Sequence, residues 1–171
     1  LRVGMESSLH DVLGWTLSHQ TLDGVYAWAE QVSPVGLGFT GGDMPHAWAA
    51  ASFYTLARTM VLWEDGDIMR LFTLAPSWWF EDGREVVANN LPTIYGDITI
   101  RTTTDVTMTE NGWRGTLRLS YTLDGELPEG GMMWRLPYAP SNIRTVNGAT
   151  YADGILTLPA VDDVIVLEFG E

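Results

Sequence analysis

Two stretches in the second half of the chain decide the fold class: DITIRTTTD at residues 97–105 and WRGTLRLSYTLD at residues 113–124. In both, β-branched and aromatic residues alternate with polar ones, which is the two-residue period of a half-buried strand. Glycine-containing pairs typical of tight turns recur around them, because glycine supplies the positive φ that hairpin turns need. The pattern predicts an antiparallel β-sandwich of seven or eight strands. The pairs are Asp82-Gly83, Asn111-Gly112, Asp124-Gly125, Asn147-Gly148 and Asp153-Gly154.

The residues before position 65 show a helical period instead. In MESSLHDVLGWTLSHQ, residues 5–20, apolar residues recur at steps of three and four, which predicts an amphipathic helix. A second helix is expected from Pro45 to about Glu64, because proline is tolerated in the first helical turn. Helices and strands are thus segregated along the chain, which favours two packed modules. We expect an α+β protein with an α-helical hairpin over residues 1–66 and an antiparallel β-sandwich over residues 67–171.

The second predicted helix has no polar face. HAWAAASFYTLARTMVLW, residues 46–63, carries Arg58 as its only formal charge. A helix that is apolar all round needs cover on every side, and its run of three alanines, residues 49–51, would let neighbouring backbones approach closely. Three kinds of cover remain open: further helices of a longer parent chain or of a partner subunit, a compact two-helix cap on the sandwich, or an oligomer.

Composition restricts the classes of ligand. The 171 residues carry a net charge of −13, and the nine basic residues are all arginine. Binding of nucleic acid or of an anionic membrane surface depends on clustered positive charge, so we expect neither partner. Neutral sugars remain compatible with this charge. The absence of cysteine excludes thiolate metal sites, and neither EDGD nor Asp162-Asp163 has the spacing of a calcium loop. We expect no metal and no organic cofactor.

A long loop between the two predicted helices holds the candidate chemistry. Residues 21–44 are rich in glycine, and a loop of this length in a compact domain is uncommon and typically functional. Within it Glu30 follows Trp28, and His46 and Trp48 open the next helix. An indole face can stack on a sugar ring while a neighbouring carboxylate deprotonates a water molecule. The loop is therefore a candidate sugar site.

The same residues resemble a known family. The motif AWAEQV, residues 27–32, followed by GGDMPHAWAAASFYTLARTM, residues 41–60, resembles the last hairpin of six-hairpin (α/α)6-barrel glycoside hydrolases. The likeness is closest to the glucoamylase-like and amylo-α-1,6-glucosidase-like groups. LFTLAPSWWF, residues 71–80, and NNLPTIYGDITIR, residues 89–101, resemble the start of the C-terminal β-sandwich found in many bacterial members. The resemblance covers most of residues 1–105.

The resemblance implies roles for five residues. Glu30 would be the general base of an inverting mechanism, with Gln31 as its neighbour, and Trp28, His46 and Trp48 would line the sugar site. An inverting glycosidase also needs a second carboxyl group roughly 6.5–9.5 Å from the base. In these families that acid comes from an earlier hairpin, which has no counterpart here. The chain is therefore predicted to be the C-terminal part of a hydrolase of α-glucosidic or related bonds, the last pair of helices of an incomplete barrel, and to be inactive alone.

Each candidate also has a structural interpretation. Glu30 can be a solvated loop carboxylate, His46 a capping residue and Trp48 a residue of the helix core. Trp78 and Trp79, in APSWWF, can form an exposed aromatic platform for a polysaccharide, or they can fix the helical part to the sandwich. The alternative function is thus a non-catalytic β-sandwich module that binds carbohydrate or supports a partner subunit.

Overall fold

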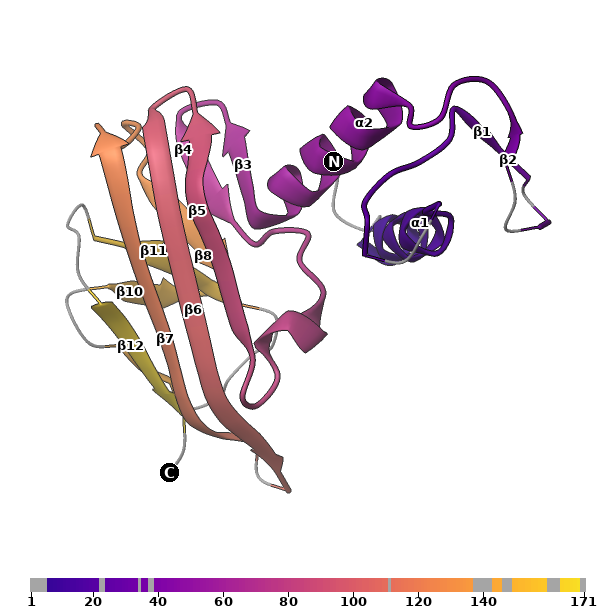
Figure 1. Cartoon of the computed structure of the whole chain (residues 1–171). Coiled ribbons are helices and arrows are strands. Elements are labelled where there is room, and N and C mark those ends of the chain that lie inside the picture. The colour runs from indigo at the N-terminus through magenta and orange to yellow at the C-terminus, as the bar shows by residue number, and fades with distance from the viewer. Residues whose placement is uncertain are drawn as a thin grey trace. The chain divides into compact units, whose positions relative to one another are not determined.

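The chain divides into two compact units, residues 1–59 and residues 60–171 (Figure 1). The sequence predicted a boundary after residue 66, and the division lies somewhat earlier, after residue 59. The computed structural model describes residues 6–21, 24–33, 35–36, 39–110, 112–136, 143–145, 149–159 and 164–169.

The first unit contains two helices and a small sheet. The apolar period of three and four residues correctly predicted the first helix, α1 (Glu6–Ser18). Strands β1 (Gln31–Val32) and β2 (Phe39–Gly41) pair antiparallel. Helix α2 (Ala47–Val61) follows, and its last two residues already belong to the second unit.

The predicted helical hairpin is wrong. The described residues hold two α-helices, and the chain between them forms its own sheet, β1–β2, instead of a turn that pairs two helices. The second helix also ends earlier than predicted: after Val61 the chain passes directly into strand β3 (Leu62–Asp65). Apolar periodicity identifies a helix but not its packing partner, and tertiary pairing overrides helix propensity at Leu62, which lies fully buried opposite Leu71. The protein is a β-rich α+β protein.

The second unit consists of two five-stranded sheets, which Figure 1 shows facing each other. One sheet has the order β10-β11-β8-β4-β3, and the other has the order β5-β6-β7-β12-β9. The first comprises β3, β4 (Ile68–Leu71), β8 (Met132–Arg135), β10 (Thr150–Ala152) and β11 (Ile155–Leu158). The second comprises β5 (Glu85–Thr93), β6 (Gly96–Thr109), β7 (Gly112–Gly125), β9 (Ile143–Thr145) and β12 (Val164–Phe169). A short 3₁₀ helix, η1 (Ser77–Phe80), precedes β5.

Turn chemistry explains some connections and not others. Asp153 and Gly154 both have positive φ, 52° and 81°, and close the β10–β11 hairpin as predicted. Gly83 instead links η1 to β5, and Gly125 ends β7 opposite Gly96, so neither belongs to a hairpin turn. The predicted turns at Asn111-Gly112 and Asn147-Gly148 involve positions outside the described residues.

One pairing corrects the prediction of a purely antiparallel sandwich. Strands β4 and β8 run parallel, with Met69 opposite Met132 and Leu71 opposite Trp134. Parallel neighbours need a long crossover connection, and here the whole of the second sheet's β5–β7 meander lies between them in the chain. No local turn signal announces such a pairing.

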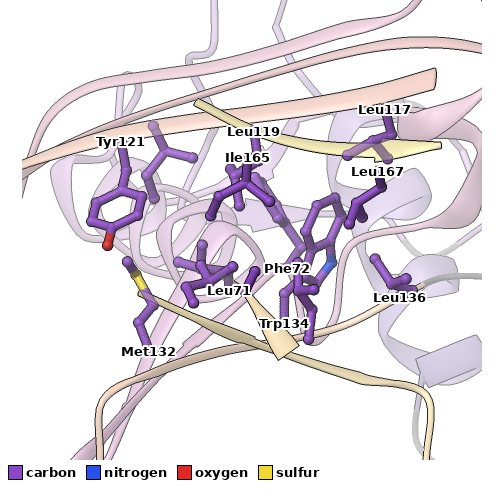
Figure 2. Close-up of a cluster of buried hydrophobic side chains, with 14 of the residues drawn as sticks. Leu71, Phe72, Leu117, Leu119, Tyr121, Met132, Trp134, Leu136, Ile165 and Leu167 are labelled. Atoms are coloured by element: carbon purple, nitrogen blue, oxygen red, sulfur yellow. The ribbon is translucent and has the colours of Figure 1, made fainter. Parts of the chain in front are cut away.

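The two sheets share one hydrophobic core (Figure 2). Trp134 is fully buried, and its ring centroid lies 5.1 Å from that of Phe72 and 5.1 Å from that of Phe80. Side chains of the facing sheet, among them Leu117, Leu119, Ile165 and Leu167, complete the cluster. The core therefore belongs to residues of the second unit.

Candidate functional site

The segment around Glu30 is held in place by backbone hydrogen bonds within the first unit. The Glu30 N–H donates to the carbonyl oxygen of Asp43 at 3.0 Å, and the His46 N–H donates to that of Trp28 at 2.8 Å. These bonds extend the pairing of β1 with β2 toward the start of α2. Glu30 is thereby fixed opposite the residues that lead into the second helix.

Gly42 makes room for the Glu30 side chain. Its φ is +79°, and a Cβ atom placed there would overlap with the Glu30 side chain. On the next residue, the Asp43 N–H donates to Glu30 Oε2 at 3.3 Å. Gly42 thus has a structural reason, because only a residue without a side chain lets the Glu30 carboxylate lie over this turn.

Trp28 joins the loop to both helices. It is 5% exposed, and its indole N–H donates to the carbonyl oxygen of Thr16 in α1 at 2.7 Å. Its ring packs against Phe53 of α2 with centroids 4.6 Å apart, and Tyr26 lies beside it at 6.4 Å. Trp28 therefore positions the carboxylate two residues further on.

These elements enclose an open pocket of about 290 Å³. Its walls come from α1, from the segment that leads into β1 and from α2, and they are mainly apolar. The rings of Trp15, Trp28 and Phe53 contribute to them, together with His19. Glu30 is the only carboxylate among the described residues that line the pocket. An apolar hollow with a few polar groups is the usual form of a small-molecule site.

His19 is a member of this site that the sequence did not single out. Its Nδ1 lies 2.7 Å from the carbonyl oxygen of Trp15, so this nitrogen carries the hydrogen and Nε2 of the neutral ring is an acceptor. The His19 ring also stacks on the Trp15 ring at 4.0 Å. The only available signal was the spacing of four residues between Trp15 and His19, which places both on one helix face.

The structure brings two of the five predicted site residues together at the pocket. Glu30 and Trp28 line it, whereas Gln31, His46 and Trp48 are not among its lining residues. Gln31 lies in β1, beside Gly41 of β2. The His46 carbonyl accepts the Ala50 N–H at the start of α2, and the Trp48 side chain is 77% exposed. The sugar-binding roles of these residues stay predictions.

Two further features concern the described residues as a whole. In this part of the chain no group of three or more His, Asp or Glu side chains is arranged to hold a metal ion. None of its helices combines the length and the apolar character needed to cross a membrane.

Comparison of the chain with protein-family models, with curated proteins and with solved structures finds no match in any of the three. Function therefore has to be inferred from the residues of the site.

Proposed function

We propose that this chain is part of a glycoside hydrolase, similar to the glucoamylase-like and amylo-α-1,6-glucosidase-like enzymes, that cleaves α-glucosidic or related bonds with inversion. Glu30 is its general base. The observation that supports the proposal is the position of the Glu30 carboxylate at an open pocket walled by aromatic rings. A sugar ring presents an apolar face to such walls and its hydroxyl groups to the carboxylate.

In the proposed reaction a Glu30 oxygen takes a proton from a water molecule as the water oxygen bonds to the anomeric carbon. The bond from that carbon to the glycosidic oxygen breaks, and a second carboxylic acid protonates the departing oxygen. The hydrogen bond from the Asp43 N–H to Oε2 restrains the Glu30 side chain. A restrained base loses less freedom when the water is positioned for attack.

The second carboxyl group has to come from outside the pocket lining, because Glu30 is the only carboxylate among the described lining residues. The chain alone is therefore expected to be inactive. Further helices of the same protein, or a partner subunit, would supply the acid. Large exposed side chains of the first unit outside the pocket lining, including Tyr26, Trp48 and Tyr54, offer these elements an apolar surface.

Trp15 and Trp28 take different parts in this proposal. Trp15 is 46% exposed and offers ring surface to a sugar. Trp28 is packed inward against Phe53, so its contribution is to hold Glu30 through the loop.

The test is the change Glu30→Gln in the natural full-length protein that carries this chain, with a panel of α-glucosides and rhamnosides as substrates. Glutamine keeps the shape and an acceptor for the Asp43 N–H but cannot take a proton. We expect kcat to fall by about 10²- to 10⁴-fold with little change in KM. The matched control is Asp11→Asn, which alters an exposed carboxylate of α1 that does not line the pocket. Equal rates for both variants and the unaltered protein would overturn the proposal.

A second candidate is a non-catalytic module that binds carbohydrate. The exposure of Glu30 and the inward packing of Trp28 favour it, since neither arrangement requires chemistry at the carboxylate. Under this alternative, Glu30→Gln changes the affinity for sugar and no hydrolysis accompanies binding. Hydrolysis that depends on Glu30 would exclude it.

A further inference from the structure

The second unit has a hollow of its own at the edge strand β5. Its volume is about 360 Å³, and it is lined by η1, the start of β5 and Val61. Three of its lining side chains, Val61, Trp79 and Val86, also pack against the hydrophobic core. Because the core fixes these residues, the wall of the hollow is formed before any ligand arrives.

Trp78 forms the exposed side of this hollow. It is 51% exposed, although its neighbours Trp79 and Phe80 are held by the core. The rings of Trp78 and Trp79 meet edge to face, with centroids 6.1 Å apart and planes at 83°. Among the described residues neither indole N–H has a hydrogen-bond acceptor. A large aromatic ring is thus held at the surface with its polar group still available.

Arg84 supplies the polar side of the hollow. Its backbone is anchored, since the Arg84 N–H donates to the backbone carbonyl oxygen of Glu81 at 3.0 Å and the Arg84 carbonyl oxygen accepts the Thr104 N–H at 3.0 Å. Its neighbour Glu85 is engaged by Arg101, whose Nε lies 2.5 Å from Glu85 Oε1. This hydrogen bond and the charge of Glu85 raise the pKa of the Arg101 guanidinium. The Arg84 guanidinium forms no ion pair with a described carboxylate and keeps its N–H donors for a ligand.

We propose that this hollow binds one neutral sugar ring of an oligosaccharide or polysaccharide. The ring stacks on Trp78, and its hydroxyl groups accept hydrogen bonds from the Arg84 guanidinium. The site goes beyond the proposed hydrolase function, because it lies in the second unit and does not involve Glu30.

Charge and desolvation favour a sugar over other occupants. Glu81, Asp82 and Glu85 are neighbours of Arg84 in the chain, and with Arg84 and Arg101 they leave this segment without a net positive charge that would attract a phosphate or carboxylate. An apolar side chain of a protein partner would cover the Arg84 guanidinium without giving it an acceptor, which is costly. A ligand with an apolar ring face and several hydroxyl groups can stack on Trp78 and accept hydrogen bonds from Arg84.

The test is a titration of the labelled full chain with maltohexaose, cellohexaose and xylohexaose in turn, followed by nuclear magnetic resonance. At least one of the three should shift the Trp78 indole N–H signal and the backbone amide signals of Val86 and Val87, which also line the hollow. Trp78→Ala and Arg84→Gln, both followed at these backbone amides, should each weaken the affinity by at least about tenfold. Their matched controls are Ile94→Ala, an exposed apolar residue of the same unit, and Arg118→Gln, an exposed arginine of β7. Both controls should bind like the unaltered chain.

Glu30→Gln is the control that separates this site from the proposed catalytic one, and it should leave the Trp78 shift unchanged. The proposal would be overturned if none of the three oligosaccharides shifts the Trp78 signal. It would equally be overturned if Trp78→Ala and Arg84→Gln bind as tightly as the two controls. A change in oligomeric state of Trp78→Ala without any change in sugar affinity would show that the hollow serves protein contact instead.

Discussion

The two units of the chain differ in how many of their hydrophobic residues are buried and how many are exposed. Of the 26 buried hydrophobic residues among the described positions, 23 belong to residues 60–171, and the first unit contributes Leu13, Trp28 and Ala29. Of the 12 large hydrophobic side chains that are exposed, 8 belong to the first unit. The second unit thus has its own core, whereas the first unit exposes eight large hydrophobic side chains, of which Val12 and Trp15 line the Glu30 pocket. Exposed patches of this kind mark sites that bind a ligand or another element of structure.

The two units also differ in the length of their hydrogen-bonded strand ladders. Strands β6 and β7 pair over their full length of 14 residues each, and every pair adds to one continuous ladder. In the first unit the β1–β2 sheet joins strands of two and three residues. Short ladders with few buried contacts open at a lower free energy than long, buried ones. The first unit is therefore expected to open locally at a lower free energy than the second.

The largest expected effect is the loss of Trp134 from the core. Trp134→Ala removes a fully buried indole between Phe72 and Phe80, so the free energy of unfolding should fall by about 3–5 kcal/mol. Trp48→Ala, at an exposed position of the first unit, should change it by less than about 0.5 kcal/mol. Urea denaturation followed by circular dichroism measures both. Equal losses would contradict the assignment of the core to the second unit.

A smaller effect is expected at Gly115, inside the β6–β7 ladder. Its φ is +132°, and an added Cβ would clash with the carbonyl oxygen of Asp105 on the facing strand. Gly115→Ala should therefore cost about 1–3 kcal/mol of unfolding free energy. Gly131→Ala is the matched control, because its φ is also positive but nothing lies within 4 Å of the added atom. A greater loss at Gly131 than at Gly115 in the same denaturation assay would disprove the close approach of the strands.

The smallest effect has the opposite sign and lies in the first unit. Gly14 is in the interior of α1, and an added Cβ meets nothing within 4 Å. Gly14→Ala should stabilise the helix by about 0.5–1 kcal/mol, since glycine loses more backbone freedom than alanine. The amides of α1 should then exchange with deuterium about two- to fivefold more slowly, while those of β6 and β7 keep their rates. Faster exchange in α1 would show that the glycine is needed there.

How far the sequence predicts the fold depends on whether the signal is local. The period of apolar residues in α1 and the Asp153-Gly154 turn are local features, and both predictions are confirmed. The pairing of Leu62 with Leu71 is short-range too, but the apolar run before it continued the helical pattern, so the end of α2 was misplaced. The parallel β4–β8 pairing joins segments distant in the chain, which no local pattern encodes.

The candidate site, too, could be predicted only where the signal is local in the sequence. The carboxylate at Glu30 and the glycines of the loop are visible in the sequence, but the reason for Gly42 is not. That reason is the Glu30 side chain lying over it, which depends on the pairing of the two loop segments. His19, which directly follows α1, lines the same pocket as Trp28 and Glu30 of the loop. Such proximity follows from tertiary packing. Spacing along the chain therefore identifies candidate residues but does not predict which of them lie together at the pocket.

The most direct test of the proposed role of Glu30 is a titration of the labelled full chain with 1-deoxynojirimycin, a cationic mimic of the sugar in the transition state of glycoside cleavage. A carboxylate at a sugar site attracts the positive charge that develops on the ring. We expect shifts at the Glu30 carboxyl carbon and at Trp15 and His19 of the pocket, and we expect Glu30→Gln to abolish them. Absence of shifts at these residues, or identical shifts in Glu30→Gln, would contradict the account.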